Sequence, residues 1–284
     1  MRHRIICTIG AFASLAGTSV QAQTFTDAVN WNGAYVGVDV ATGIGGHGEG
    51  IAAIDPVRDA RFVYLEGPSR RTLSIEPDQH QSTGVGIRAG VLQQMGRLVW
   101  GIEAQMAGGD IERSFAVGPV DAGPLRTVFI SGVPAPTRTL DSLSADLNID
   151  QRVAVRLRAG LTVGDRALVS VFAGPSRARA RLTVVQDSVI EYFICDNHPV
   201  RPGLCFTREV AVSGAGTADD QLWGGVVGGA VDFRIDARWS FHGEVALTQY
   251  ESVEAQSAGV SGGNSRLAWE PELYTVNLGV DYRF

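Results

Sequence analysis

The amino-acid sequence predicts an all-β fold, an eight-stranded antiparallel up-and-down transmembrane β-barrel with short turns at one end and four long loops at the other. Three observations lead to this prediction. The last segment of the chain alternates apolar and polar residues, seven other segments do the same, and the connections between them are either very short or very long. After the N-terminus, no stretch offers about twenty consecutive apolar residues, so the sequence predicts no membrane-spanning helix.

The C-terminal segment gives the clearest pattern. Its intervening residues are polar or small, so as a strand it has one apolar and one polar face. Aromatic residues at both ends of an apolar face, with aliphatic residues between them, are typical of a strand that crosses a bilayer. Every second residue counted back from the C-terminus belongs to this face: Phe284, Tyr282, Val280, Leu278, Val276 and Tyr274.

Both ends of the chain resemble a known family. Trp31–Ala41 reads WNGAYVGVDVA and resembles the opening strand of small outer-membrane barrels of alphaproteobacteria. The ending at Tyr282 and Phe284 resembles the C-terminal assembly signal of bacterial outer-membrane barrels. The resemblance is to the OmpA-like "porin family", which includes opacity-type surface proteins, and it implies an eight-stranded monomer. It also implies location in the outer membrane of a Gram-negative bacterium, with membrane lipid, lipopolysaccharide and the barrel-assembly machinery as partners.

The other strands follow from alternation. Between the first strand and the last, Glu272–Phe284, we expect six more: Gln81–Gln93, Leu98–Ala107, Ile149–Thr162, Ala167–Leu182, Leu222–Ile235 and Trp239–Tyr250. Three connections are tight turns, and the others exceed usual loop lengths. Short turns in the periplasm and long loops outside the cell are the arrangement of outer-membrane barrels. The predicted long extracellular loops are Thr42–His80, Gly108–Asn148, Thr183–Gln221 and Glu251–Pro271.

The fifth predicted strand has two apolar sets of opposite parity. A β-bulge at Gly174-Pro175 would give both sets a common outward face. With this bulge, Ala178, Ala180 and Leu182 would point outward. The alternate arginines would then point inward or to the barrel mouth: Arg177, Arg179 and Arg181.

The N-terminus reads as a secretory signal. Arg2 and Arg4 precede the short apolar run Ile5–Val20, and a cleavage-like Val20-Gln21-Ala22 follows. We therefore expect residues 1–22 to be removed and residues 23–284 to form the barrel domain.

Two cysteines remain after cleavage, Cys195 and Cys205. In an exported protein the expected arrangement is a disulfide that closes a short loop. A metal site with Asp196 and His198 is the alternative, but it lacks a clear fourth ligand and the paired C-x-x-C spacing.

Charged residues recur on the faces expected to point inward. Eight strands enclose a lumen that side chains nearly fill, and buried charges must pair. Arg88 and Glu103, on neighbouring strands, are expected to lie close together. The cluster is either a structural ion-pair core or an ion path or gate, and the narrow lumen favours the first. Its predicted members are Arg88, Glu103, Arg152, Arg156, Arg158, Asp232 and Glu244, with Asp39 on the same side.

The sequence predicts no enzyme, cofactor or metal. His80 and Ser82 could in principle serve acyl transfer, but no oxyanion hole can be named. The net charge of −6 and the lack of a basic-aromatic patch argue against nucleic acid.

We therefore expect a structural and surface role in the outer membrane, with envelope integrity and loop-borne binding of extracellular or host-surface ligands. Loop arginines could also bind lipopolysaccharide phosphates: Arg58, Arg61, Arg70 and Arg71. A small-solute channel through the lumen and a lipid-modifying enzyme are the alternatives.

Overall fold

A computed structural model describes residues 30–45, 49–54, 71–75, 82–121, 126–130, 133–196, 204–259 and 264–284. No helix in these ranges is long and apolar enough to span a membrane. The strands in the described ranges are β1 Gly33–Gly45, β2 Glu49–Ile54, β3 Arg71–Ile75, β4 Ser82–Met95, β5 Leu98–Asp121, β6 Arg126–Ile130, β7 Val133–Val163, β8 Ala167–Asp196, β9 Leu204–Arg234, β10 Trp239–Tyr250, β11 Val253–Gly259, β12 Asn264–Glu270 and β13 Glu272–Arg283.

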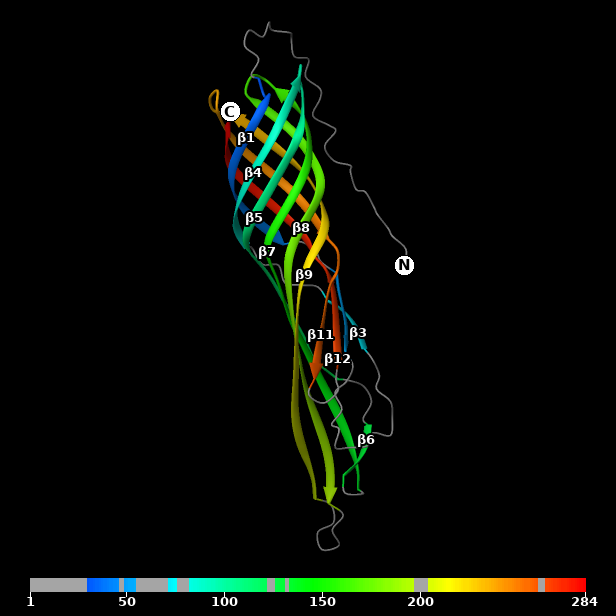
Figure 1. Cartoon of the computed structure of the whole chain (residues 1–284). Helices are drawn as coiled ribbons and strands as arrows, with labels where there is room; N and C mark the ends of the chain where they lie inside the picture. The colour runs from blue at the N-terminus through cyan, green and yellow to red at the C-terminus, as the bar shows by residue number, and fades with distance from the viewer. Residues whose placement is uncertain are drawn as a thin grey trace, which may run out of the picture.

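Eight of these strands close into a ring (Figure 1), in the order β1, β4, β5, β7, β8, β9, β10, β13 and back to β1. Each strand pairs antiparallel with its neighbours, so the ring satisfies backbone hydrogen bonds without a free edge. The predicted fold class is confirmed.

The short turns and the C-terminus lie at one end of the barrel (Figure 1). The turns after β4 and β7 contain Gly96 and Gly164, whose φ angles of 64° and 61° favour glycine. In the turn after β9, the Asp236 carboxylate accepts hydrogen bonds from the backbone N–H groups of Arg238 and Trp239, at 2.7 and 2.8 Å. These bonds hold the pKa of Asp236 below its ordinary value. All three turns lie where the sequence predicts them.

An apolar band faces outward around this part of the barrel. Val38 and Leu157 are 61% and 70% exposed, which suits contact with lipid rather than with a protein core. Near the short turns, Trp239 packs edge-on against Tyr282, with ring centroids 5.1 Å apart. In β9 the exposed Phe233 and Trp223 bracket the band. At the rise and tilt of barrel strands, their separation corresponds to roughly 25 Å along the membrane normal.

Beyond this band the strands continue and their polarity reverses. We call this part the extension: residues 109–121 of β5, 133–149 of β7, 180–196 of β8 and 204–220 of β9, with β2, β3, β6, β11 and β12. Much of the sequence predicted as long loops is therefore strand. The reason is that the extension alternates apolar residues inward and polar residues outward, as a water-exposed sheet does. Its inward residues form an apolar cluster, the outer core, which includes Ile111, Phe115, Leu143, Leu147, Ile149, Ala180, Leu182, Val184, Leu267 and Trp269.

The predicted bulge in the fifth strand is wrong. β8 pairs with β9 without a register shift from Ala167 to Asp196, through Gly174 and Pro175. Consequently Ala178, Ala180 and Leu182 are buried, and Arg177, Arg179 and Arg181 are exposed.

The physical reason is a change of surroundings along an uninterrupted strand. At this level the outside changes from lipid to water, and the inside changes from charged groups to an apolar core. The apolar residues change faces while the backbone keeps its alternation. A register shift does occur nearby, in β7 between Ile149 and Gln151.

The inward position of Leu182 leads to a prediction. Leu182→Ala should destabilise the protein by about 2–4 kcal/mol, because it leaves a cavity in the outer core. Leu157→Ala removes a lipid-facing side chain and should cost less than about 1 kcal/mol. Urea unfolding of both variants in detergent micelles measures the difference. Equal losses would mean that Leu182 faces outward.

Candidate functional site

Charged side chains fill the lumen inside the apolar band. Most of the predicted cluster is buried, and Arg152 is half-buried. Each residue lies on the inward side of its strand, so the structure brings the predicted charges together. The fully buried members are Arg88, Glu103, Arg156, Arg158, Asp232 and Glu244, with Asp39 beside them.

Arg156 of β7 links two sides of the barrel. Its Nη1 donates to Glu244 Oε1 of β10 at 2.8 Å, and its Nη2 donates to Glu103 Oε1 of the neighbouring strand β5. The guanidinium carbon also lies 4.2 Å from the ring centroid of Phe172. Since β7 and β10 are not neighbours in the sheet, the Arg156–Glu244 pair crosses the lumen.

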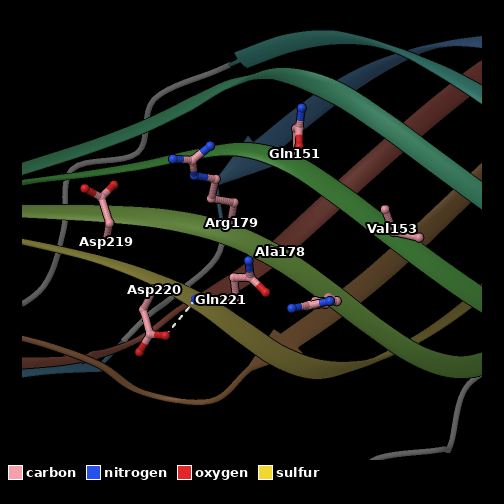
Figure 2. Close-up of a pocket in the computed structure, with 8 residues that line it drawn as sticks. Gln151, Val153, Ala178, Arg179, Asp219, Asp220 and Gln221 are labelled. Carbon is pink, nitrogen blue, oxygen red and sulfur yellow. Dashed lines mark hydrogen bonds between the residues drawn. The ribbon is translucent and has the colours of Figure 1, made fainter.

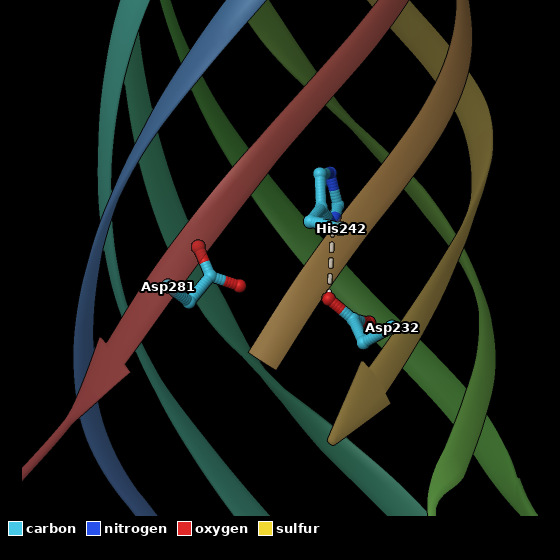
Figure 3. A group of neighbouring side chains, drawn as sticks. All are labelled: Asp232, His242 and Asp281. Atoms are coloured by element: carbon cyan, nitrogen blue, oxygen red, sulfur yellow. Dashed lines mark hydrogen bonds and ion pairs between the residues drawn. The ribbon is translucent and has the colours of Figure 1, made fainter. Parts of the chain in front are cut away.

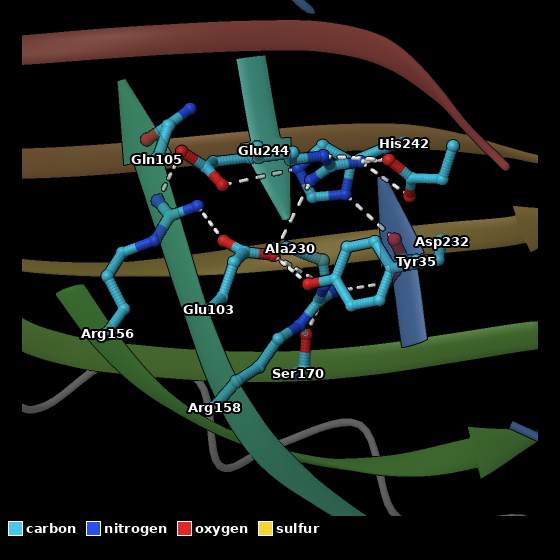
Figure 4. Close-up of polar contacts among 12 residues, drawn as sticks. Tyr35, Glu103, Gln105, Arg156, Arg158, Ser170, Ala230, Asp232, His242 and Glu244 are labelled. Carbon is cyan, nitrogen blue, oxygen red and sulfur yellow. Dashed lines mark hydrogen bonds and ion pairs between the residues drawn. The ribbon is translucent and has the colours of Figure 1, made fainter. Parts of the chain in front are cut away.

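Arg158 and His242 extend the network (Figure 4). Arg158 Nη2 donates to Asp232 Oδ2, and its Nε donates to Ser170 Oγ at 2.8 Å. His242 lies between two carboxylates, with Nδ1 2.8 Å from Asp232 Oδ1 and Nε2 3.2 Å from Glu244 Oε2. Ionised carboxylates only accept hydrogen bonds, so both contacts are satisfied when the imidazole ring carries two protons.

Arg88 makes a two-pronged contact with Asp281. Its Nε and Nη2 donate to the two carboxylate oxygens at 2.8 and 2.6 Å. Arg88 Nη1 also lies 4.0 Å from Glu103 Oε2, which in turn accepts a hydrogen bond from Tyr35. A Cβ at Gly37 would lie 2.0 Å from Asp281 Oδ1, so glycine leaves room for this pair.

The ion pairs of this network join three arginines and His242 to four carboxylates, and the charges of these paired groups balance when the imidazole ring carries two protons. The paired groups are Arg88, Arg156, Arg158 and His242 against Glu103, Asp232, Glu244 and Asp281. Pairing of this kind offsets the large cost of burying each charge alone. The geometry therefore fits a structural ion-pair core.

Three of these side chains also form a possible metal cluster (Figure 3). One ligand atom each from Asp232, His242 and Asp281 lies within 4.8 Å of the others. However, Arg158 already contacts Asp232 and Arg88 already contacts Asp281. A cation here would displace these pairs and face the guanidinium groups, so the residues fit ion pairing better than metal binding.

Side chains fill the lumen on both sides of the ion-pair network. Toward the short turns, Trp31 packs with Tyr35, Leu92, Val99 and Leu168. The guanidinium carbons of Arg283 and Arg234 lie 4.5 and 4.9 Å from Trp31 ring centroids. Toward the extension, a cavity of about 30 Å³ separates the network from the outer core. A cavity of this size holds about one water molecule.

Two contributors, Tyr35 and Asp281, were not among the predicted members of the cluster. Both lie on the polar faces of their strands, and that parity was the signal that could have added them. By the same alternation the sequence sets His242 on the inward face of its strand beside Glu244, and the structure has it there.

Other predicted sites are tested only in part. The backbone register sets Cys195 opposite Cys205, the arrangement that a cross-strand disulfide needs, but the disulfide stays a prediction. His80 lies outside the described residues, so its pairing with Ser82 is untested. Also outside are the signal segment, His198, Arg58, Arg61 and Arg70, while Arg71 begins β3. Tyr282 belongs to the aromatic contacts near the C-terminus, and the assembly signal at Tyr282 and Phe284 stays a prediction.

A match to one protein family agrees with the fold. The family model described as "Outer membrane protein beta-barrel domain" matches residues 10–284. A comparison with curated proteins found no match.

Among solved structures, the chain is similar to the outer membrane protein OprG from Pseudomonas aeruginosa, at 12% identity and a TM-score of 0.43, covering 90% of this chain and 97% of that one. Ail from Yersinia pestis matches at 8% identity and a TM-score of 0.31, covering 89% and 99%. The outer membrane protease OmpT from Escherichia coli matches at 10% identity and a TM-score of 0.32, covering 93% and 99%. These likenesses bear on neither substrate nor activity.

The Arg156 contacts lead to a prediction for stability. Arg156→Met removes a positive charge that pairs with the buried carboxylates of Glu103 and Glu244. The change should destabilise the folded barrel by about 3–5 kcal/mol. Arg166→Met, on an exposed turn, is the control and should change stability by less than about 0.5 kcal/mol. Urea unfolding in micelles measures both.

The double variant Arg156→Met/Glu244→Gln should lose less than the sum of the single variants, since the two residues share one contact. Simple additivity of the two losses would contradict the pairing.

Proposed function

We propose that this chain, which belongs to the outer membrane protein beta-barrel domain family, serves as a structural barrel that holds its extension at the cell surface. The filled lumen is the observation that carries the proposal: apolar side chains, the ion-pair network and the outer core follow one another along the barrel. On this proposal the protein supports envelope integrity, and extracellular or host-surface ligands meet the extension.

The proposal sets aside the small-solute channel. A channel needs a water-filled path with groups that bind the solute weakly enough to release it. Here the lumen charges bind one another, and several pairs join strands that are not neighbours. Opening a path would expose or unpair these charges together, at a large cost in free energy.

The proposal also sets aside the lipid-modifying enzyme. The ion-paired carboxylates, His242 and Ser170 are buried. His242 contacts Asp232 and Glu244, and Ser170 accepts a hydrogen bond from Arg158. They offer no group open to a substrate.

The extension suits contact with water and partners. Its outward face carries exposed ion pairs, such as Arg138–Asp121 and Arg266–Glu254. We propose that residues 1–22 direct export and are removed, and that the barrel-assembly machinery reads the terminal aromatic residues Tyr282 and Phe284.

Single-channel recording tests the closed lumen. Refolded protein comprising residues 23–284 should give no steady conductance in planar bilayers, because side chains fill the lumen. Slower electrophoretic migration after heating serves as the control that the barrel was folded. Steady openings whose size changes in Glu103→Gln would overturn the proposal in favour of a channel.

Cysteine labelling tests the orientation. In a background with Cys195→Ser and Cys205→Ser, Ser213→Cys in β9 should react with a membrane-impermeant maleimide on intact cells. Asp165→Cys, in the turn between β7 and β8, should react only after the outer membrane is permeabilised. The reverse labelling pattern would place the extension in the periplasm and contradict the surface role.

A further inference from the structure

Three arginines lie on one outward face of β8 where the apolar band ends. Arg177, Arg179 and Arg181 are all exposed, and each has a neighbour on β7 and on β9. Consecutive rows change from largely apolar to polar. In β7, β8, β9 order the rows are Val153–Arg177–Trp223, Gln151–Arg179–Gln221 and Asn148–Arg181–Asp219. Arg177 therefore marks the level at which the lipid-facing surface gives way to the extension.

The arginines differ in their partners. Arg181 Nε donates to Asp219 Oδ1 at 2.8 Å, so its charge is neutralised. The Arg177 guanidinium carbon lies 5.3 Å from a Trp223 ring centroid, a contact that leaves its N–H groups free to donate. No hydrogen bond or ion pair joins Arg179 to another residue of the described ranges.

The two arginines without an acidic partner line a surface hollow of about 720 Å³ (Figure 2). Gln151 and Gln221 add polar groups beside them, and Val153 lies at the membrane side. Residues two apart on a strand are roughly 7 Å apart. Arg177 and Arg179 can therefore each bind a separate phosphate group, or both can bind one phosphate that lies between their guanidinium groups.

Two acidic residues also line the hollow, but their positions limit the negative charge that they add at its membrane side. Asp219 is paired with Arg181. Asp220 pairs in register with Ala180, one step farther from the membrane than Gln221, and its Oδ1 accepts the Gln221 backbone N–H at 2.7 Å. The membrane side of the hollow is therefore positively charged.

We propose that Arg177 and Arg179 bind the phosphate groups of a phosphorylated glycolipid in the outer leaflet, the chemistry of lipopolysaccharide. Guanidinium groups form paired hydrogen bonds with phosphate oxygens. Arginines at the rim of an apolar band stand at headgroup level, where anionic lipids concentrate. Trp223 and Val153 flank Arg177 in its row, one row nearer the membrane than Arg179. On this proposal they contact the first carbons of the acyl chains. This site is separate from the lumen, and it requires that the extension lies at the cell surface.

A binding titration tests the site. Refolded protein in neutral detergent micelles is titrated with fluorescently labelled lipopolysaccharide that carries both lipid A phosphates, and polarisation gives Kd. Arg177→Ala/Arg179→Ala should bind about thirtyfold more weakly, since each arginine near an anionic surface contributes about a fivefold gain. Both side chains are exposed, so urea unfolding should match that of the unaltered protein.

The matched control is Arg97→Ala/Arg166→Ala. It makes the same change of charge at the short turns and should leave Kd within about threefold. Dephosphorylated lipopolysaccharide should bind the unaltered protein and the Arg177/Arg179 variant equally weakly.

Equal Kd values for the unaltered protein and the Arg177/Arg179 variant would overturn the proposal, as would an equal loss in the control. Full competition by millimolar inorganic phosphate would also overturn it, because the site would then take free phosphate rather than a lipid. The assay works in micelles, so its result is independent of conductance and of orientation in cells.

Discussion

The pairing of charge inside a closed lumen is the constraint on which the rest of the barrel depends. The arginines of the ion-pair network each have a carboxylate within reach, because a lone buried charge is very costly. The pairs Arg156–Glu244, Arg158–Asp232 and Arg88–Asp281 each join strands that are not sheet neighbours. They connect β7 to β10, β7 to β9 and β4 to β13. A slip of one residue in any of these strands would move its charge to the lipid face, so the network also defines the register.

The same alternation of apolar and polar residues suits two different surroundings, the membrane band and the extension. Within the band, lipid lies outside and ion pairs lie inside, so apolar residues point outward. In the extension, water lies outside and the outer core lies inside, so apolar residues point inward. β8 makes this change without any shift in its pairing to β9. The boundary lies at Arg177, whose row still contains Val153 and Trp223.

Predictions from the sequence were correct where apolar residues face lipid and polar residues face the lumen. The eight ring strands, the turns at Gly96 and Gly164 and the inward charges follow from apolar residues facing lipid. The rule failed at Ala178 and Leu182, because an apolar strand face can point either to lipid outside the barrel or to an apolar core inside it. It thus predicted a bulge and loops where the structure has strands. The partners of Arg156 could not be predicted either, since contacts across the lumen depend on the register of all eight strands together.

Because the charges in the lumen pair with one another, the lumen offers few places for a binding or transport site. Moving any one of the arginines exposes at least one carboxylate without its partner, so the network resists partial opening. Glu103 shows why, because Tyr35, Arg156 and Arg158 all contact it and no single shift frees it. On our proposal, ligand recognition takes place on the outer surface, where side chains are free to exchange water for a ligand. On β8, Arg181 is already matched by Asp219, whereas Arg179 faces the hollow without such a partner. This difference between two arginines on one strand face is the reason that we propose a phosphate-binding surface here.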